Sequence, residues 1–362
     1  MKHITLSGIR WKVARKVVAS MLLCLPFVGS RAADEPGNSL TPITVIYFTG
    51  SSEGLLVNVM TEQHFFEKNG LKPSFASATS GPAITSALAS GNVQFAPGYP
   101  ALYLPALKQN RDLIVASPFV QPGFYNIIAQ PSFDIKNPGI GLTEEAKANL
   151  KLLLGHQVGV TALGAQTQVT VQLLATKAGL DWHNIAFIPT GGASTAIASF
   201  LNKQIDFLVT WPPEEGILAS RKAAYKTVVN SATSEKNQFE NLANNAWLAN
   251  GEFVRTHPKA ALGLCRAAIE ASTFITNPMN KDAVLAIMKK YQGLTQDAAE
   301  NVYENWRWVW APSQDNYLSK ARWDAQSRYL VGSSIEGYVP DYEKYLNKDC
   351  MELGRQAIKA AR

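Results

Sequence analysis

The sequence predicts an α/β protein of two lobes followed by a helical C-terminal extension. Short apolar runs alternate with stretches of helical periodicity, and the alternation starts again near Gln157. After Trp247 the helical periodicity continues without further strands. Alternation of strands and helices is typical of parallel sheets whose strands are joined by crossover helices. The 362 residues are enough for two separate cores.

The first 32 residues have the three-part pattern of a cleavable export signal. Basic residues lie between Lys2 and Lys16, the apolar run Val17–Val28 follows, and Ser30-Arg31-Ala32 places small residues where a signal peptidase reads them. The apolar run is shorter than the ~20 residues of a membrane-spanning helix. We therefore expect cleavage near Ala32 and a soluble protein in the periplasm.

The charge of the chain is concentrated in this signal. The formal net charge is +6, and residues 1–32 hold six Lys and Arg and no acidic residue. The mature chain is therefore close to neutral, which argues against a nucleic-acid partner. Cys265 and Cys350 remain after cleavage, and their spacing leaves open whether they form a disulfide or stay as two buried thiols.

The strands are predicted from apolar runs bounded by glycine and small polar residues. In the first unit they are Ile43–Phe48, Pro73–Ala78, Val93–Ala96 and Leu113–Ser117, and in the second unit Gln157–Thr161, Ile185–Pro189 and Ile205–Val209. Helices are predicted between them, ending at Gly70, Gly91 and Gly179. The stretches Phe75–Phe95 and Phe187–Phe207 follow similar patterns, which indicates two similar units.

The C-terminal extension is predicted to be almost entirely helical and to pack around the first lobe. The predicted helices are Pro258–Thr276, one capped by Asn280 and ending at Tyr291, one capped by Thr295 and ending near Trp310, and two more near 316–331 and 341–361. Trp306, Trp308 and Trp310 lie on a late helix and are interpreted as packing residues. Thr143-Glu144-Glu145 indicates an added helix in the second lobe.

Catalytic and metal sites are not predicted. The histidines at positions 64, 156, 183 and 257 are isolated, and no nucleophile elbow, Walker loop or dinucleotide fingerprint is present. The adjacent acids Glu214 and Glu215 would point in different directions on a helix, and a solvated first helical turn explains them more simply. We therefore expect no cofactor, no metal and no enzymatic activity.

Four strand-to-helix loops are built from small and polar residues without acids. They are Thr49–Ser52, Thr79–Gly81, Gly164–Thr167 and Thr190–Ser194. Such loops let a ligand approach backbone N–H groups, and helix N-termini favour electron-rich groups. Ordinary helix capping uses the same residues, and for any single loop it remains an alternative.

Aromatic residues follow the same strands and would give a cavity apolar walls. The complete set of candidate ligand-binding residues is Thr49, Ser51, Ser52, Thr79, Ser80, Gly81, Tyr99, Phe119, Tyr125, Gln166, Thr167, Gly191, Gly192, Trp211 and Glu214.

The order of several short motifs resembles a known family. They are Gly159-Val160-Thr161, Gly164, Gln166-Thr167, Ala178-Gly179-Leu180, Ile188-Pro189-Thr190-Gly191-Gly192, Gln204-Ile205-Asp206 and Trp211-Pro212-Pro213, with Ser80-Gly81, Gly91 and His257-Pro258 in the first lobe. Together they resemble the substrate-binding proteins of nitrate/sulfonate/taurine-type ABC importers, a family that also includes pyrimidine-precursor binders. The resemblance spans about residues 43–291.

The resemblance implies the type II periplasmic-binding-protein fold. Residues 41–128 and 248–362 would form lobe 1 and residues 129–247 lobe 2, with crossing segments near Ile127–Ala129 and Trp247–Gly251. A ligand would be trapped as the lobes close about a hinge. The implied partners are a small-molecule ligand and an ABC permease in the inner membrane, with the protein itself a monomer.

The predicted ligand is a small organic anion of the sulfonate or aromatic carboxylate type. No Arg lies beside the four loops to bind a carboxylate with two hydrogen bonds, so a neutral pyrimidine-type heterocycle is the alternative. A ligand sensor that signals to a membrane partner is a second alternative, and an enzyme using the same cleft is the weakest.

Overall fold

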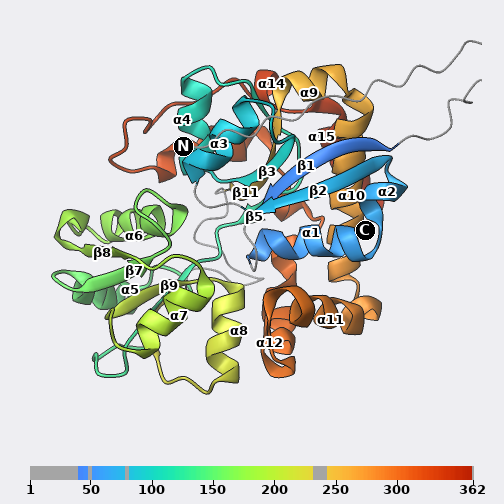
Figure 1. Cartoon of the computed structure of the whole chain (residues 1–362). Coiled ribbons are helices and arrows are strands. Elements are labelled where there is room, and N and C mark those ends of the chain that lie inside the picture. Colours follow the sequence, from blue (N-terminus) through green and yellow to red (C-terminus); the bar gives the residue numbers. More distant parts are fainter. Residues whose placement is uncertain (1–39, 48–50, 78–80, 231–242, 361–362) are drawn as a thin grey trace, which may run out of the picture. The chain divides into compact units, whose positions relative to one another are not determined.

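The computed structural model describes residues 40–47, 51–77, 81–230 and 243–360 (Figure 1). The predicted export signal therefore lies outside the described residues, as do the candidate ligand residues Thr49, Thr79 and Ser80. In the part of the chain that is described, no helix combines the length and the apolar character needed to cross a membrane.

The first sheet combines five strands from the N-terminal part of the chain with one that returns later. The strands are β1 (Thr41–Tyr47), β2 (Leu71–Ser77), β3 (Phe95–Gly98), β4 (Leu113–Val115), β5 (Gln121–Pro122) and β11 (Ala243–Asn250). Their order is β2-β1-β3-β11-β4, with β5 paired to β11. β1 is parallel to β2 and β3, whereas β11 is antiparallel to β3, β4 and β5.

The second sheet is also mixed. It contains β6 (Asn126–Ala129), β7 (Gln157–Val160), β8 (Ala186–Pro189), β9 (Phe207–Thr210) and β10 (Lys226–Val229), in the order β10-β6-β9-β7-β8. β7 is parallel to β8 and β9, but β6 is antiparallel to β9 and β10. The expectation of purely parallel sheets is therefore wrong at β6 and β11. β6 enters the second sheet directly after β5 of the first sheet, without a crossover helix that would reverse the chain.

The chain passes between the sheets twice. The first passage lies between Pro122 and Asn126, and the second between Val229 and Ala243. The segments expected to cross belong to the strands that follow each passage, β6 and β11. The strand pairing thus assigns β6 to the second sheet and β11 to the first. The division into two lobes that move as bodies stays a prediction.

Helices occupy most of the remaining chain. They are α1 (Ser52–Glu62), α2 (Phe65–Lys68), α3 (Gly81–Ala89), α4 (Pro100–Lys108), α5 (Glu144–Leu150), α6 (Gln166–Lys177), α7 (Ala193–Leu201), α8 (Pro212–Ser220), α9 (Gly251–Thr256), α10 (Pro258–Thr276), α11 (Lys281–Gln292), α12 (Gln296–Trp306), α13 (Lys320–Ala325), α14 (Tyr342–Tyr345) and α15 (Lys348–Ala360). Ser51, Thr143 and Thr295 cap α1, α5 and α12 with side-chain oxygens. The helices predicted from Thr143, Pro258 and Thr295 are thus confirmed at their starts.

The last fifty residues differ from the prediction of two long helices. Between 314 and 329 only α13 is α-helical, and it lies between two short 3-10 segments. α14 has four residues and is separated from α15 at Leu346. Trp306 ends α12, while Trp308 and Trp310 lie in the 3-10 segment Arg307–Trp310 rather than on one continuous helix. Trp306 and Trp310 are buried, in agreement with a packing role.

A disulfide links two helices of the C-terminal extension, and a third helix of the extension packs against α8. A disulfide between Cys265 and Cys350 joins α10 to α15, with a Sγ–Sγ distance of 2.12 Å, which answers the question that the spacing left open. α12 packs against α8, and Figure 1 draws the two helices side by side. At their contact a Cβ on Gly216 would lie 2.8 Å from the Ala298 carbonyl oxygen, so only glycine allows this approach.

Candidate functional site

One large cavity lies where the loops of both sheets meet. Its volume is about 1020 Å³, which is the upper end of ordinary small-molecule sites. It is bordered by the start of α1, the end of β2, α3, α4, the passage before β6, the loops after β7, β8 and β9, and β11. Open α/β sheets bind ligands at this edge, outside the carboxyl ends of the parallel strands.

Nine of the candidate ligand residues border this cavity. They are Ser51, Ser52, Tyr99, Tyr125, Gln166, Thr167, Gly191, Gly192 and Trp211. Gly81 is the first residue of α3. Phe119 and Glu214 do not border the cavity. A ligand-binding role for the nine residues stays a prediction.

Two of the hydroxyl groups are used to close loops. The Ser51 Oγ accepts a hydrogen bond from the Gly54 backbone N–H at 3.1 Å and so caps α1. The Thr167 Oγ1 accepts from the Thr161 backbone N–H at 3.0 Å and lies 2.8 Å from the Thr161 hydroxyl oxygen. For Ser51 and Thr167, helix capping and loop closure therefore account for the side chain on their own.

The helices α6 and α7 begin at the cavity without a side-chain cap. Their N-cap residues are Ala165 and Gly192, and neither makes a capping hydrogen bond. Gly191 has a φ of +75°, a conformation that favours glycine, and it turns the chain into α7. The first backbone N–H groups of both helices are thus left for another acceptor, and the helix dipoles favour an electron-rich one.

Gln166 is the first residue of α6 and has an unusual environment. The side chain is only 2% exposed, and within the described residues neither amide atom has a hydrogen-bond partner. An unpaired buried amide costs free energy on the order of 1–3 kcal/mol. Because Gln166 borders the cavity, a molecule bound there can form hydrogen bonds with its amide.

Three aromatic side chains also border the cavity. Tyr99 is the N-cap of α4, Tyr125 lies in the passage before β6, and Trp211 is the N-cap of α8. The Tyr125 and Trp211 rings meet edge to face, with centroids 6.4 Å apart. Burial raises the pKa of Tyr99 to about 12 and raises the pKa of Tyr125 further. Both phenols therefore stay neutral at physiological pH.

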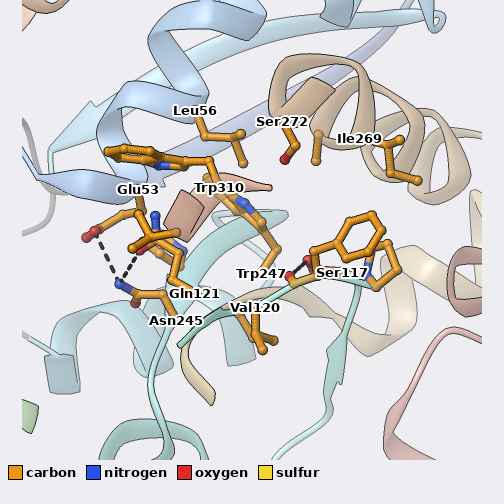
Figure 2. A pocket seen from close by; sticks show the side chains of 16 residues that line it. Glu53, Leu56, Ser117, Val120, Gln121, Asn245, Trp247, Ile269, Ser272 and Trp310 are labelled. Carbon is orange, nitrogen blue, oxygen red and sulfur yellow. Dashed lines mark hydrogen bonds between the residues drawn. The ribbon is translucent and has the colours of Figure 1, made fainter. Parts of the chain in front are cut away.

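A buried glutamate lies beside these aromatic side chains. Glu53 borders the large cavity and also a second one of about 40 Å³. Figure 2 shows the Asn245 amide between Glu53 and Gln121, donating to the Glu53 Oε2 and to the Gln121 Oε1, each at 3.3 Å. The Ser52 hydroxyl donates to the same Gln121 oxygen at 3.0 Å. Burial raises the pKa of the Glu53 carboxyl, and hydrogen bonds from its backbone and from Ser51 and Ser52 offset this only in part.

Arg111 borders the cavity although no cation was expected there. It follows α4, away from the four loops, and its side chain is exposed. Among the residues that the structure describes, its guanidinium makes no ion pair. The expectation that no arginine lies beside the four loops is compatible with this position, because the fold brings the end of α4, and not a loop, to the cavity.

Glu214 is buried and Glu215 is half-buried, so the expectation of a solvated helical turn is wrong. Glu214 is 0% exposed, and no described side chain donates to its carboxylate. Burial raises its pKa well above the usual value, a backbone hydrogen bond at Trp211 offsets this in part, and Glu215 raises it further. The Glu215 Oε1 accepts from Asn126 and from Thr210, each at 2.8 Å.

Phe119 is a candidate ligand residue that borders a different cavity. Its ring contacts Tyr317 with centroids 6.4 Å apart, and it borders the 40 Å³ cavity instead of the large one. Trp310 borders the same small cavity, and its indole N–H donates to the Ser52 carbonyl oxygen at 2.9 Å. Within the described residues no group of three or more His, Cys, Asp or Glu side chains could hold a metal ion.

The chain is similar to known binding proteins. A candidate binding protein of Brucella abortus strain 2308 is 28% identical over 269 residues, which are 73% of this chain and 75% of that relative. The structure of the periplasmic aliphatic sulphonate binding protein SsuA of Escherichia coli has a TM-score of 0.57 at 17% identity, covering 74% of this chain and 79% of that one. The periplasmic nitrate-binding protein NrtA of Synechocystis PCC 6803 has a TM-score of 0.63 at 13% identity, covering 89% and 90%.

The structural likeness at these identities shows the fold, and it confirms the predicted periplasmic-binding-protein architecture. The family model described as NMT1/THI5 like matches residues 55–281, which include most of both sheets and nearly all of the cavity. The chain therefore belongs to the NMT1/THI5-like family and has the fold of the periplasmic binding proteins.

Proposed function

We propose that this protein is the periplasmic solute-binding component of an ABC importer. It captures a small organic anion of the sulfonate or aromatic carboxylate type and delivers it, without chemical change, to a permease in the inner membrane. The protein acts as a monomer after cleavage of its export signal. The family membership and the folds of the sulphonate-binding and nitrate-binding proteins support this role.

The observation that supports an anionic ligand is the pair of helix N-termini at the cavity that have no side-chain cap. α6 and α7 direct backbone N–H groups and the positive ends of their dipoles to one side of it. Arg111 adds a positive charge on the border. Tyr99, Tyr125 and Trp211 provide an apolar wall for the body of the ligand.

A neutral heterocycle is the second candidate. The observation that favours it is Gln166, whose amide has both a donor and an acceptor unpaired among the described residues. A ring that carries an N–H beside a carbonyl would satisfy both atoms, whereas a sulfonate offers only acceptors.

A thermal-unfolding screen of the purified chain tests the ligand class. The probes are alkanesulfonates, aromatic sulfonates, aromatic carboxylates and pyrimidines, each over a range of concentrations. A ligand at 100 times its dissociation constant stabilises the fold by about 2.7 kcal/mol. Stabilisation by sulfonates or carboxylates supports the anion, and stabilisation by pyrimidines alone replaces it with the heterocycle. Conversion of a probe during incubation, followed by mass spectrometry, would contradict a pure binding role.

A further inference from the structure

We propose that the C-terminal extension positions the start of α1 at the cavity, and that Gln292 and Trp310 are the positioning residues. Neither of them is among the described residues that border the large cavity, so they act through the backbone of Ser51 and Ser52, which do border it. This inference deepens the proposed function and rests on it for the use of the cavity.

Two hydrogen bonds from the extension reach the first residues of α1. Gln292 ends α11, and its side-chain amide donates to the Ser51 carbonyl oxygen at 2.9 Å. Trp310 ends the 3-10 segment after α12, and its indole N–H donates to the Ser52 carbonyl oxygen at 2.9 Å. The Ser51 carbonyl oxygen also accepts from the Leu55 backbone N–H at 3.3 Å. Because a carbonyl oxygen can accept two hydrogen bonds, the extension adds to the helical hydrogen bond without replacing it.

The same stretch of α11 also holds the other end of α1. The Lys290 Nζ donates to the Glu62 Oε1 at 2.8 Å, and the Tyr291 hydroxyl donates to the same oxygen. Glu62 is the last residue of α1. An exposed ion pair of this kind adds little free energy, but it provides a second point of attachment. Residues 290–292 thus contact both ends of one helix, so α1 cannot shift along its axis unless these contacts break.

The start of α1 also meets the strands beside the two passages between the sheets. The Ser52 hydroxyl donates to the Gln121 Oε1 on β5 at 3.0 Å. The Asn245 amide on β11 donates to the Glu53 Oε2 at 3.3 Å. Trp310 and Glu53 border the same small cavity (Figure 2). Side chains from β5, β11, α11 and the 3-10 segment after α12 therefore fix this border of the large cavity together.

The environment of Gln292 indicates that its amide is kept for the hydrogen bond. Its Oε1 is buried and has no partner among the described residues, which costs free energy. An apolar side chain would fill the same space without that cost, so packing alone does not account for a glutamine. Gln292 and Trp310 also lie beyond residues 55–281, the part of the chain that the family model matches. The positioning contacts therefore come from outside the matched region.

Fixing the start of α1 in the empty protein lowers the cost of binding. A ligand that contacts Ser51, Ser52 or Glu53 does not have to order this turn when the extension already holds it. We therefore expect ligand affinity to depend on Gln292 and Trp310, although neither side chain touches the ligand.

Hydrogen exchange of the ligand-free protein, followed by mass spectrometry, tests the positioning. Trp310→Phe removes the indole N–H and keeps an aromatic ring, and Gln292→Met removes the amide donor at similar length. Each variant should speed exchange of the backbone amides of residues 53–58 by about three- to tenfold. Exchange in α10, which packs on α1 and on the same 3-10 segment, should change by about twofold at most. A general loss of packing would speed both helices alike.

Trp308→Phe and Gln296→Met are the matched controls. The Trp308 indole N–H donates to the Asn305 carbonyl oxygen at 3.0 Å, and the Gln296 amide donates to the Glu300 Oε1 at 2.7 Å. These are hydrogen bonds of the same kinds that do not reach α1, so exchange at residues 53–58 should stay unchanged. Melting curves show whether each variant folds, and the half-buried Gln292 keeps the test decisive if Trp310→Phe does not.

Isothermal titration calorimetry with benzenesulfonate at neutral pH tests the consequence for binding. Gln292→Met and Trp310→Phe should each weaken its affinity by about three- to tenfold, and the two controls should not. Unchanged exchange in α1, or an equal rise in α10, overturns the positioning whatever the ligand is. Faster exchange with unchanged benzenesulfonate affinity overturns the role in binding. If benzenesulfonate does not bind the original protein, the sulfonate part of the proposed function fails, and the exchange measurement still decides the positioning.

Discussion

As the pH rises, the original protein should lose stability because of Glu214. Replacing Glu214 by glutamine should remove this part of the loss. Glu214 is fully buried in the first turn of α8, no described side chain donates to it, and burial raises its pKa well above the ordinary value of 4.5. Above that ordinary value the unfolded chain has lost the proton and the folded chain still holds it. Unfolding becomes easier by about 1.4 kcal/mol for each pH unit, until the folded carboxyl ionises too.

Glutamine has nearly the same shape as glutamate and no titrating proton. The variant therefore lacks the decrease of unfolding free energy with pH that Glu214 causes. The cost of burying its amide does not depend on pH. The difference in unfolding free energy between the variant and the original protein should therefore grow in favour of the variant as the pH rises through this interval. Urea unfolding at a series of pH values, with common slopes against denaturant, measures it.

Glu145→Gln is the control, since Glu145 is an exposed residue in the first turn of α5. Its effect should stay within about 0.5 kcal/mol at every pH. Parallel pH curves for the original protein and the Glu214 variant would refute the reasoning, because they would show that the folded carboxyl titrates as it does in the unfolded chain.

Three further predictions concern packing, the disulfide and the ligand wall. Gly216→Ala should destabilise the fold by about 1–3 kcal/mol in urea unfolding, because its Cβ would meet the backbone of α12. This loss should outweigh the higher helix propensity of alanine. Unchanged stability would mean that α8 and α12 separate easily. Reduction of the Cys265–Cys350 disulfide should lower the unfolding free energy by about 2–5 kcal/mol, and a melting curve unaffected by reductant would contradict this. Trp211→Ala should weaken binding of whichever probe the screen identifies by about tenfold, whereas Trp308→Ala, away from the cavity, should not; equal affinities would remove Trp211 from the site.

The order of strands and helices could be predicted from the sequence because it depends on local patterns. Alternation of apolar runs with helical periodicity gave both units, and polar caps such as Thr143 and Thr295 fixed where helices begin. The directions of β6 and β11 could not be predicted. They depend on which sheet the strand joins after a passage between the units, and nothing within the strand itself records that choice.

The site shows the same division between local and distant causes. Small loops and neighbouring aromatics placed Tyr99, Gln166 and Trp211 at one cavity, since strand ends gather at one edge of a sheet. Arg111 was missed because it follows a helix instead of a strand. Glu214 was misjudged because an acid in a first helical turn gives the same pattern whether its side chain faces solvent or the interior of the protein.

The contact between α8 and α12 limits how the protein can open. α8 begins at Trp211 on the cavity wall and, at Gly216, presses backbone to backbone on α12, which belongs to the extension beyond β11. The segment that forms the second sheet is thus held to the rest of the chain by the two passages and by helix contacts that include this pair. Rotation about the two strands alone would pull that helix pair apart. If the lobes rotate as predicted, α8 would have to slide along α12, a shear movement for which the absent side chain at Gly216 leaves room.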